Sequence, residues 1–381
     1  MSRLETKLIH AGEPEPRIHG AVSMPIFQSA TFEYTDEMDY HSLKYIRLNN
    51  TPNHVALHQK LAASENAKAA LVTASGMAAI STALLTILSA GDHLLVQDCL
   101  YGGTHGFITK DLVDFGITYS FINADDPDSW KRQLQPKTKG IYVETMSNPL
   151  LQVPDLRAVV EFAKAHGLVS LIDNTFASPV NFRPSEWGFD LSLHSCTKYL
   201  NGHSDIVAGA VIGRDDLVQN IKHRLDHLGG SLDPHAAFLL HRGMKTLAVR
   251  VKFQNESTLT IARFLKDHSA VARVHYPGLE THHRHVRARE LFDGFGGVLS
   301  FELKGGVEQA QQFMRRTTVP ISAPSLGGVE TLITRPVTTS HSGMSSEDRQ
   351  RLGISDRLIR LSVGIEATED IIQDFGQALE S

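Results

Sequence analysis

Short apolar runs alternate with helical patterns along most of the chain after about Leu57. The apolar runs are AALVTA, HLLVQ, GIYVE, LVSLID, LSLHS and IVAGAVIG, with helical stretches after the first run and from about Asp155 to His166. Such alternation is typical of strand–helix–strand units. The sequence therefore predicts an α/β fold, with a mainly parallel sheet and helices on both of its faces.

The pattern changes after about Leu240. Apolar residues recur at every third or fourth position from Met244 to Leu265, which predicts one long helix leaving the first domain. Beyond it we expect VLSFEL and LIRLSVGI as strands and residues 307–316 and 367–379 as helices of a smaller α+β domain. The chain is accordingly divided into an arm over 1–45, a large domain over 46–240 and a C-terminal α+β domain over 241–381.

The N-terminal arm mixes Pro, Gly, His and charged residues with little periodicity, although PIFQSATF (25–32) could pair as a strand. Its first residues, MSRLETKLIHAGEPEPR, carry charges and prolines where a secretory signal needs an apolar run. Only two cysteines occur, Cys99 and Cys196, without the spacing of a zinc site or a disulfide scaffold. These features favour a cytoplasmic protein.

Charge and hydropathy exclude two classes of partner. The chain has 37 basic and 42 acidic residues, hence a net charge of −5, which gives no general attraction for nucleic acid. The uncharged stretch from Ala69 to Gly91 has the length of a membrane span, but Ser75-Gly76 divides it into a strand-like and a helix-like half. The helical half is about 14 residues long, as in a buried core helix rather than a span.

Common catalytic motifs are absent: there is no GxGxxG after a strand, no GxxxxGK[ST], no HExxH and no GxSxG. The segment Thr281-His-His-Arg-His285 resembles a metal cluster. Neighbouring histidines point in different directions, however, and no cysteine or carboxylate follows at ligand spacing. A solvated helix start is the simpler interpretation of this segment.

Several predicted strands end in polar residues, namely Asp98, Glu144, Asp173 and Ser195. Ligands of open α/β sheets bind beyond the carboxyl ends of the strands, so these side chains are candidates for a common site. The segment LSLHSCTKYLNGHSD places Lys198 just beyond such an end. A lysine in a polar crevice can lose its proton and form a Schiff base with a carbonyl, although a surface lysine would give the same pattern.

Asp173 follows the apolar run LVSLI, and a buried carboxylate there needs a cationic partner. Pyridoxal 5'-phosphate would supply one at its protonated ring nitrogen, while its aldehyde would take Lys198. The phosphate has a candidate site at Ser75-Gly76-Met77, where a predicted helix begins with free backbone N–H groups. Ser195 and Thr197 can donate two further hydroxyl groups.

With these motifs assembled, the sequence resembles the Cys/Met-metabolism family of pyridoxal-phosphate enzymes, the transsulfuration enzymes related to cystathionine gamma-synthase and gamma-lyase. The resemblance runs from about Met24 to the C-terminus. It rests on TASGMAA, DCLYGGT, VETMSNPLL, LIDNTFASP, HSCTKYLNGHSD, SLGGVETL and LIRLSVGIE, in the order expected of the family. It implies a fold of the aspartate-aminotransferase type (fold-type I) and a homotetramer built from two dimers.

The resemblance also implies roles for individual residues. Lys198 would be the Schiff-base lysine, Asp173 the partner of the ring nitrogen, and Tyr101 the aromatic residue stacked on the ring. The phosphate would be held by Gly76, Met77, Ser195 and Thr197, and by Tyr45 and Arg47 from a neighbouring subunit. Asn148 and Arg360 would bind the substrate α-carboxylate, with Ser325 close by.

The residues agree with two of these roles. Two glycines follow Tyr101, which would let a flat ring approach the cofactor, although a core tyrosine before a turn is the alternative. Arg360 lies in the otherwise apolar run LIRLSV, where its charge needs an anion. A substrate carboxylate would serve, and so would a structural ion pair.

The chain departs from the family's pattern at positions that bear on substrate choice. The arm motif reads YIRLNNTP, with Tyr45 and Arg47 kept but the Thr-Pro order reversed. Gly106 stands where many cystathionine-handling members have arginine, and Pro324 where gamma-lyases often have glutamate. Lys44, next to Tyr45, is then a candidate for binding a substrate's distal carboxylate, with a solvated arm lysine as the alternative.

We therefore expect an enzyme that cleaves or forms a C–S bond in cystathionine or a related homoserine-derived amino acid. In the shared mechanism the freed Lys198 removes the α-proton and Asp173 keeps the ring protonated. Methionine gamma-lyase, cystathionine beta-lyase and O-acylhomoserine sulfhydrylase remain alternatives. A catalytically silent binding protein would be expected to lack Lys198 or Asp173, and a dehydrogenase would need the missing glycine motif.

Overall fold

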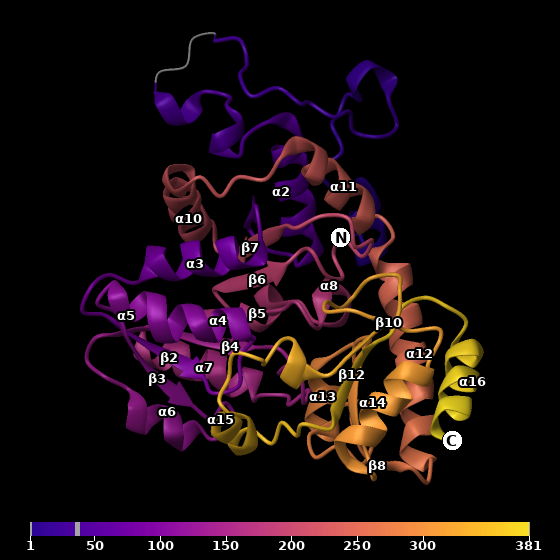
Figure 1. The fold of residues 1–381 in the computed structure, drawn as a ribbon. Coiled ribbons are helices and arrows are strands. Elements are labelled where there is room, and N and C mark those ends of the chain that lie inside the picture. Colours follow the sequence, from indigo (N-terminus) through magenta and orange to yellow (C-terminus); the bar gives the residue numbers. More distant parts are fainter. Residues whose placement is uncertain (1, 35–38, 381) are drawn as a thin grey trace.

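A seven-stranded sheet forms the centre of the larger part of the molecule in a computed structural model that describes residues 2–34 and 39–380 (Figure 1). Its strands are β1 (Ala69–Thr73), β2 (His93–Gln97), β3 (Thr118–Ile122), β4 (Thr138–Glu144), β5 (Val169–Asp173), β6 (Leu191–Ser195) and β7 (Gly209–Gly213). They lie in the order β1-β7-β6-β5-β4-β2-β3. All neighbours pair in parallel except β7, which is antiparallel to both β1 and β6, so the predicted mainly parallel sheet is confirmed.

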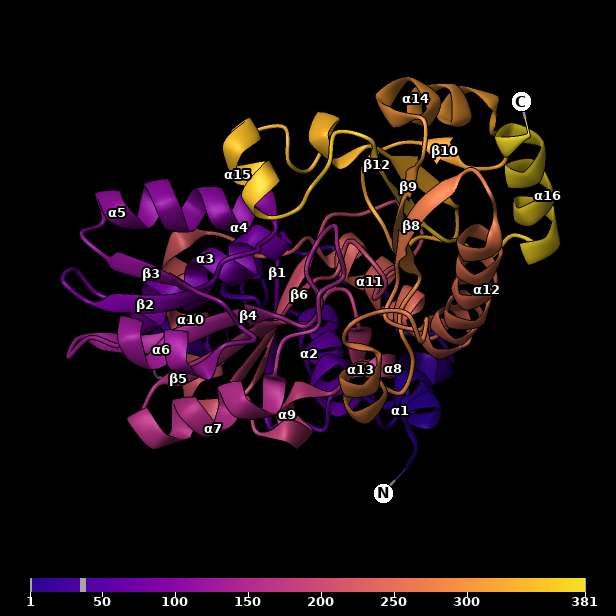
Figure 2. The same ribbon diagram turned by 90° about the horizontal axis from the view of Figure 1, so that it is seen from below.

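Helices cover both faces of this sheet (Figure 2). The apolar residues of α3 (Gly76–Ile87), α5 (Leu112–Asp114) and α10 (Asp215–Leu228) pack on one face. Those of α2 (Pro52–Ser64), α6 (Pro127–Gln133), α7 (Leu156–His166) and α11 (Pro234–Met244) pack on the other face. The short elements α4 (Gly102–Gly106), α8 (Ser178–Asn181) and α9 (Pro184–Trp187) complete this part, with a π-helical turn over Phe107–Asp111.

A second sheet of five strands follows in the order β10-β11-β12-β9-β8. Its strands are β8 (Val271–His275), β9 (Val298–Leu303), β10 (Ile321–Ser322), β11 (Leu332–Thr334) and β12 (Leu358–Ser362). Its apolar face packs against α12 (Leu247–Asp267), α14 (Gly306–Arg316) and α16 (Thr368–Leu379). Within this part, α13 (His285–Leu291) lies between β8 and β9, and a 3₁₀ turn over Pro336–Thr338 and α15 (Ser346–Arg351) lie between β11 and β12.

The N-terminal residues contain one short helix, α1 (Leu4–His10), and 3₁₀ turns over Ile18–Gly20, Tyr40–Ser42 and Ile46–Leu48. The predicted strand at 25–32 is wrong, because only Thr31 forms an isolated bridge, with Tyr45. The side chain of Asn53 takes the backbone bonds that a strand partner would make. It accepts from Phe27 N at 2.8 Å and donates to Pro25 O at 2.8 Å.

The long helix predicted from Met244 to Leu265 is confirmed as α12, which begins three residues later than predicted, at Leu247. α11 ends at Met244 and α12 begins at Leu247. Between them, the Thr246 hydroxyl donates to Gly243 O at 3.1 Å and accepts from Arg250 Nε at 3.0 Å. Such local side-chain bonds compete with the helical ladder, which explains the break.

The uncharged stretch over residues 69–91 forms β1 and α3, both packed in the core. α3 contains 12 residues. None of the helices in residues 2–34 and 39–380 is both long enough and apolar enough to cross a membrane.

Candidate active site

Lys198 lies in the loop after β6, between the two sheets. Its Nζ donates to Ser325 Oγ at 2.7 Å, and Ser325 belongs to the connection between β10 and β11. Burial, with a smaller contribution from the charge of Arg360, lowers the pKa of Lys198 to about 8. A substantial fraction of the amine is therefore neutral near physiological pH, as a nucleophile requires.

Arg360 extends from the middle of β12 into the same space and is 4% exposed. It donates to Asn148 Oδ1 at 3.0 Å and to Ser325 O at 2.8 Å. Its Nε is buried and has no hydrogen-bond partner in the described part of the chain. Burial lowers the pKa of Arg360 to about 10, and an unpartnered donor on a buried cation is suited to a carboxylate.

The structure thus brings Lys198, Ser325, Asn148 and Arg360 into contact, although they come from different elements of both sheets. Ser325 has a φ of 111°, a conformation that non-glycine residues rarely adopt. The Arg360 bond to its carbonyl and the Lys198 bond to its hydroxyl hold both ends of this residue. Backbone strain retained by such contacts is frequent at functional sites.

Asp173 ends β5, where Oδ1 accepts from Thr175 N at 2.9 Å. Thr175 Oγ1 in turn accepts from Ser195 N at 2.8 Å, which links the ends of β5 and β6. Burial raises the pKa of Asp173. A nearby cation, such as a protonated ring nitrogen, would favour the ionised carboxylate.

Glu144 is in register with Asp173 at the end of β4, and its Oε1 accepts from Tyr101 N at 2.6 Å. Burial, reinforced by the charge of Asp173, raises the pKa of Glu144 well above its ordinary value. Glu144, one of the polar strand ends predicted to meet at a common site, thus lies beside Asp173. It fixes the backbone from which the Tyr101 side chain projects.

The N-terminus of α3 faces the end of β6. Ser75 caps the helix by accepting from Ala78 N at 3.0 Å. A Cβ atom on Gly76 would lie 2.9 Å from Ser195 Cβ, so glycine is required for this close approach. The Thr197 hydroxyl lies nearby in sequence but accepts from Ala208 N at 3.1 Å and donates to Ala208 O at 3.3 Å, so it is already engaged.

Tyr101 is 45% exposed, which is high for a large aromatic side chain. A Cβ atom on Gly103 would lie 2.6 Å from Tyr101 Cε1 and 3.2 Å from Met77 Sδ. The ring therefore lies over Gly103, next to the first turn of α3. This arrangement leaves an open aromatic face beside the Ser75-Gly76-Met77 turn.

Tyr45, Arg47 and Lys44 lie in the N-terminal segment, which extends from one end of the molecule (Figure 1). The guanidinium of Arg47 donates to Asp226 O and to the Tyr40 hydroxyl, and its central carbon lies 5.7 Å from the Tyr45 ring centroid. Lys44 is exposed. Within one chain the structure therefore does not bring these three residues to Lys198.

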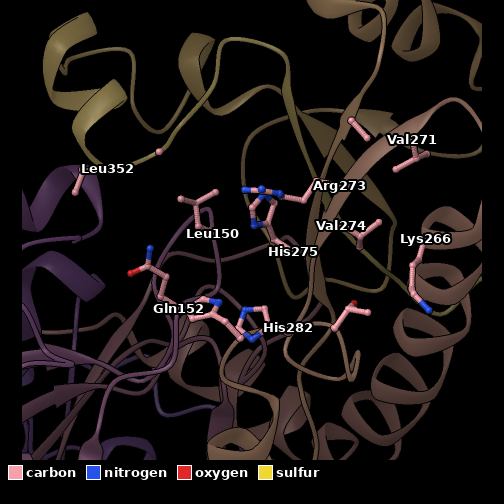
Figure 3. A pocket seen from close by; sticks show the side chains of 13 residues that line it. Leu150, Gln152, Lys266, Val271, Arg273, Val274, His275, His282 and Leu352 are labelled. Carbon is pink, nitrogen blue, oxygen red and sulfur yellow. The ribbon is translucent and has the colours of Figure 1, made fainter.

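A separate cavity of about 620 Å³ lies along β8 and contains none of the predicted site residues (Figure 3). Its lining includes Arg273, His275, His282 and His283. His282 is buried rather than solvated, and α13 begins only at His285. Over residues 2–34 and 39–380, no group of three or more His, Cys, Asp or Glu side chains is arranged to hold a metal ion.

The residues between the two sheets fit pyridoxal phosphate. A partly neutral lysine, a half-buried carboxyl that forms no ion pair with a described side chain and a close-packed helix start offer groups for its aldehyde, its ring nitrogen and its phosphate. The unpartnered Arg360 Nε leaves a donor for the substrate carboxylate.

Comparisons with known proteins agree with this chemistry. A family model described as Cys/Met metabolism PLP-dependent enzyme matches residues 5–380. The chain is 40% identical to the cystathionine beta-lyase MetC of Bacillus subtilis, over 99% of this chain and 96% of that protein. It is 39% identical to the L-methionine gamma-lyase of Fusobacterium nucleatum subsp. polymorphum, over 99% and 98%.

A solved structure of a cystathionine lyase has the same fold. The cystathionine gamma-lyase of Lactobacillus plantarum complexed with L-serine superposes with a TM-score of 0.95 at 38% identity. The match covers 100% of this chain and 99% of that one.

Proposed function

Because this chain belongs to the family of Cys/Met metabolism PLP-dependent enzymes, we propose that it is a lyase that cleaves a C–S bond of cystathionine. Its fold is that of the fold-type I enzymes, and it is a pyridoxal-phosphate-dependent enzyme of sulfur amino-acid metabolism. The observation that carries the proposal is the contact of Lys198 Nζ with Ser325, whose carbonyl is held by Arg360. In the proposal this lysine is the base and this arginine binds the substrate carboxylate.

When bound, pyridoxal phosphate supplies an aldehyde that joins to an amine and a ring that accepts the electron pair left on the substrate's α-carbon. Lys198 would hold the cofactor before reaction and, once displaced by the substrate amine, would take the α-proton on Nζ. Asp173 would keep a proton on the ring nitrogen, and Tyr101 would cover one face of the ring. Ser75, Gly76, Met77 and Ser195 would hold the phosphate.

Substrate orientation follows from Arg360 and Asn148. Arg360 Nε and the amide of Asn148 would bind the α-carboxylate, which fixes the α-carbon relative to Lys198. Ser325 Oγ accepts from Lys198 Nζ and so directs the amine. A lysine whose pKa is about 8 can both accept and release a proton near neutral pH at a small cost in free energy.

A lyase reaction is favoured over C–S bond formation because the relatives described above are named as lyases. The B. subtilis and L. plantarum proteins are named cystathionine beta-lyase and gamma-lyase, at 40% and 38% identity. Methionine gamma-lyase is the main alternative, at 39% identity. These identities differ too little to separate the substrates.

A substrate panel tests the proposal. Cystathionine, methionine, cysteine and an O-acylhomoserine with a thiol are assayed for ammonia, keto acid, free thiol and thioether. Pyruvate with homocysteine would define beta-elimination of cystathionine, and 2-oxobutyrate with cysteine would define gamma-elimination. Turnover of methionine but not of cystathionine, or thioether formation without keto acid, would contradict the proposal.

We also propose that the protein is a cytoplasmic homotetramer whose active sites are shared between subunits. Each chain is divided into an arm (1–45), a large domain (46–240) and a C-terminal domain (241–381). The two cysteines, Cys99 and Cys196, are buried free thiols, consistent with a reducing compartment. Tyr45 and Arg47 would reach the phosphate of a neighbouring subunit. Lys44 would approach the distal carboxylate of cystathionine there, and replacing it with alanine would then raise KM more for cystathionine than for methionine.

A further inference from the structure

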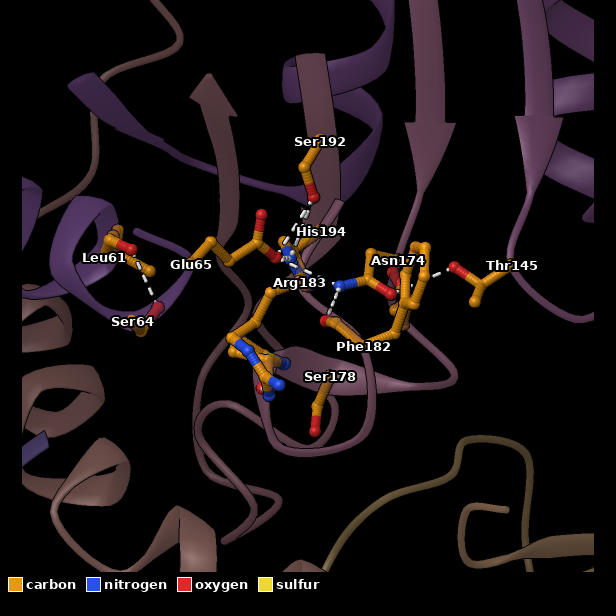
Figure 4. Close-up of polar contacts among 12 residues, drawn as sticks. Leu61, Ser64, Glu65, Thr145, Asn174, Ser178, Phe182, Arg183, Ser192 and His194 are labelled. Carbon is orange, nitrogen blue, oxygen red and sulfur yellow. Dashed lines mark hydrogen bonds and ion pairs between the residues drawn. The ribbon is translucent and has the colours of Figure 1, made fainter. Parts of the chain in front are cut away.

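A wholly buried carboxylate lies on the α2 face of the large sheet, opposite the face on which Ser195 meets α3. It belongs to Glu65, directly after the last residue of α2. Its Oε1 accepts from His194 Nε2 at 2.6 Å, Asn174 Nδ2 at 3.0 Å and Ser192 Oγ at 3.1 Å (Figure 4). Three donors on one oxygen favour the ionised form of a carboxyl group.

A buried negative charge needs a cation, and His194 is in position to provide it. The His194 and Glu65 side chains are 1% and 0% exposed. Lys60, earlier on α2, is engaged elsewhere, since its Nζ donates to two carbonyls of α1 at 2.7 and 3.3 Å. Arg183 pairs with Glu186 and Asp293. Among the described residues, His194 is therefore the basic side chain in contact with the Glu65 carboxylate.

The pair is connected to Asp173 in two ways. Asn174, which binds Glu65, follows Asp173, and Thr145 Oγ1 donates to Asp173 O at 2.9 Å and to Asn174 Oδ1 at 3.0 Å. His194 also follows Leu193, the register partner of Asp173 in β6. The charge of His194 acts against burial and lowers the pKa of Asp173.

We propose that Glu65 and His194 are positioning residues that hold a fixed positive charge beneath Asp173, so that its carboxylate stays ionised for the cofactor's ring nitrogen. The inference rests on the proposed function, since it assumes that pyridoxal phosphate binds there. Glu65 also ties the ends of β5 and β6 together and so fixes the strand ends that carry Asp173 and Ser195.

Burial raises the pKa values of three neighbouring groups, Glu144, Tyr142 and the Cys196 thiol, which favours the neutral form of each. In the proposed arrangement Glu65 and His194 form a pair without net charge. Asp173 then adds one negative charge, which a protonated ring nitrogen would balance.

The test uses the cofactor-loaded full-length protein and nuclear magnetic resonance. With ¹⁵N-labelled protein, the His194 imidazole, assigned by its loss in His194→Gln, should show both ring nitrogens protonated at pH 7. With ¹⁵N-labelled pyridoxal phosphate, the ring nitrogen should show the shift of a protonated pyridine. In Glu65→Gln the His194 imidazole should show only one protonated ring nitrogen at pH 7, and the signal of the cofactor's ring nitrogen should move toward the unprotonated position.

Ser192→Ala is the matched control, because it removes one donor from the same Glu65 oxygen and leaves the charge pair intact. Both signals should stay as in wild type. A neutral His194 at pH 7 in the wild-type protein would overturn the inference even if Glu65→Gln failed to fold. An unchanged signal from the cofactor's ring nitrogen in a folded Glu65→Gln variant would also overturn the inference. Failure of the wild type to bind pyridoxal phosphate would instead overturn the proposed function.

Discussion

Two lysines with lowered pKa values, the buried Lys60 and the half-buried Lys198, differ in what they can react with. Burial lowers the pKa of both lysines to about 8. Lys60 Nζ donates to the carbonyls of Leu8 and Ile9, whereas Lys198 Nζ contacts the Ser325 hydroxyl. A depressed pKa makes an amine nucleophilic, but its position decides which carbonyl it meets.

We therefore expect pyridoxal phosphate, fixed by borohydride, to label Lys198 and not Lys60. The rate of uptake should rise with pH and level off above about 8, because only the neutral amine reacts. An exposed lysine, with a pKa near 10.4, would give a rate still rising at that pH. Peptide mapping of the reduced adduct at several pH values checks both points. Label on Lys60, or full turnover by Lys198→Ala, would contradict the assignment.

Catalysis should be sensitive even to a substitution at Arg360 that keeps the positive charge. Lysine offers a point charge and cannot bind Asn148, the Ser325 carbonyl and a carboxylate together, as the planar guanidinium can. Arg360→Lys should lower kcat/KM for cystathionine roughly 100-fold, equivalent to the loss of one or two charge-assisted hydrogen bonds. Steady-state kinetics measure the loss.

Arg335→Lys provides the control for that change. Arg335 is 9% exposed, but it donates to Asp356 O, in a contact that involves none of the residues proposed for the site. It should leave kcat/KM within about threefold of wild type. An equal loss in both variants would assign the Arg360 effect to folding rather than to carboxylate binding.

At the scale of elements, predictions from short runs and from periodicity are confirmed. HLLVQ, LSLHS and VLSFEL are strands over the predicted residues. The three- and four-residue period that predicts one long helix corresponds to α12 (Leu247–Asp267). The sequence pattern does not reveal β3 (Thr118–Ile122), which lies at the sheet edge and pairs only with β2.

Some residues of the site can be predicted from the sequence, and others cannot. Lys198 and Asp173 follow apolar strands, so their positions at a sheet edge can be read from the sequence. The contact between Glu65 and His194 joins residues 129 positions apart, and nothing in the local pattern of either residue indicates it. Sequence patterns locate strand ends, but they do not reveal which distant side chain completes a buried charge pair.

The close contact between the start of α3 and the end of β6 requires glycine at position 76, and this requirement can be tested. In Gly76→Ala the new Cβ would lie 2.9 Å from Ser195 Cβ and 3.0 Å from its Cα, so the helix start must move away from the strand. We expect at least a tenfold weaker affinity for pyridoxal phosphate, because the phosphate would lose well-placed N–H donors. Titration of the cofactor-depleted protein measures this affinity.

Gly106→Ala is the matched change on α4. Nothing lies within 4 Å of a Cβ at Gly106, and alanine is favoured over glycine in a helix by about 1 kcal/mol. Cofactor affinity should be unchanged and the thermal midpoint should be equal or slightly higher. If Gly76→Ala binds cofactor as tightly as Gly106→Ala, the proposed phosphate site is wrong.

At the scale of the whole molecule, Arg47 lies apart from the phosphate site that it is proposed to complete. In one chain Arg47 contacts Asp226 and Tyr40, and the segment extends away from the two sheets (Figure 1). A cationic residue that is expected to bind phosphate but lies outside the site of its own chain indicates a site completed by a second copy. Closed dimers make such exchange reciprocal, with each copy completing the other's site.

Mixed oligomers should therefore recover activity that neither parent has. Coexpressing Arg47→Ala with Lys198→Ala gives mixed dimers in which one of the two sites combines two intact halves. Random pairing makes half of the dimers mixed, so about a quarter of the wild-type activity should return. Lys198→Ala coexpressed with Asp173→Ala is the control, because both changes lie in the same half of the site and leave at most a site lacking one of them. No recovery in the first mixture would place Arg47 in the site of its own chain, and equal recovery in both mixtures would show that shared sites are not its cause.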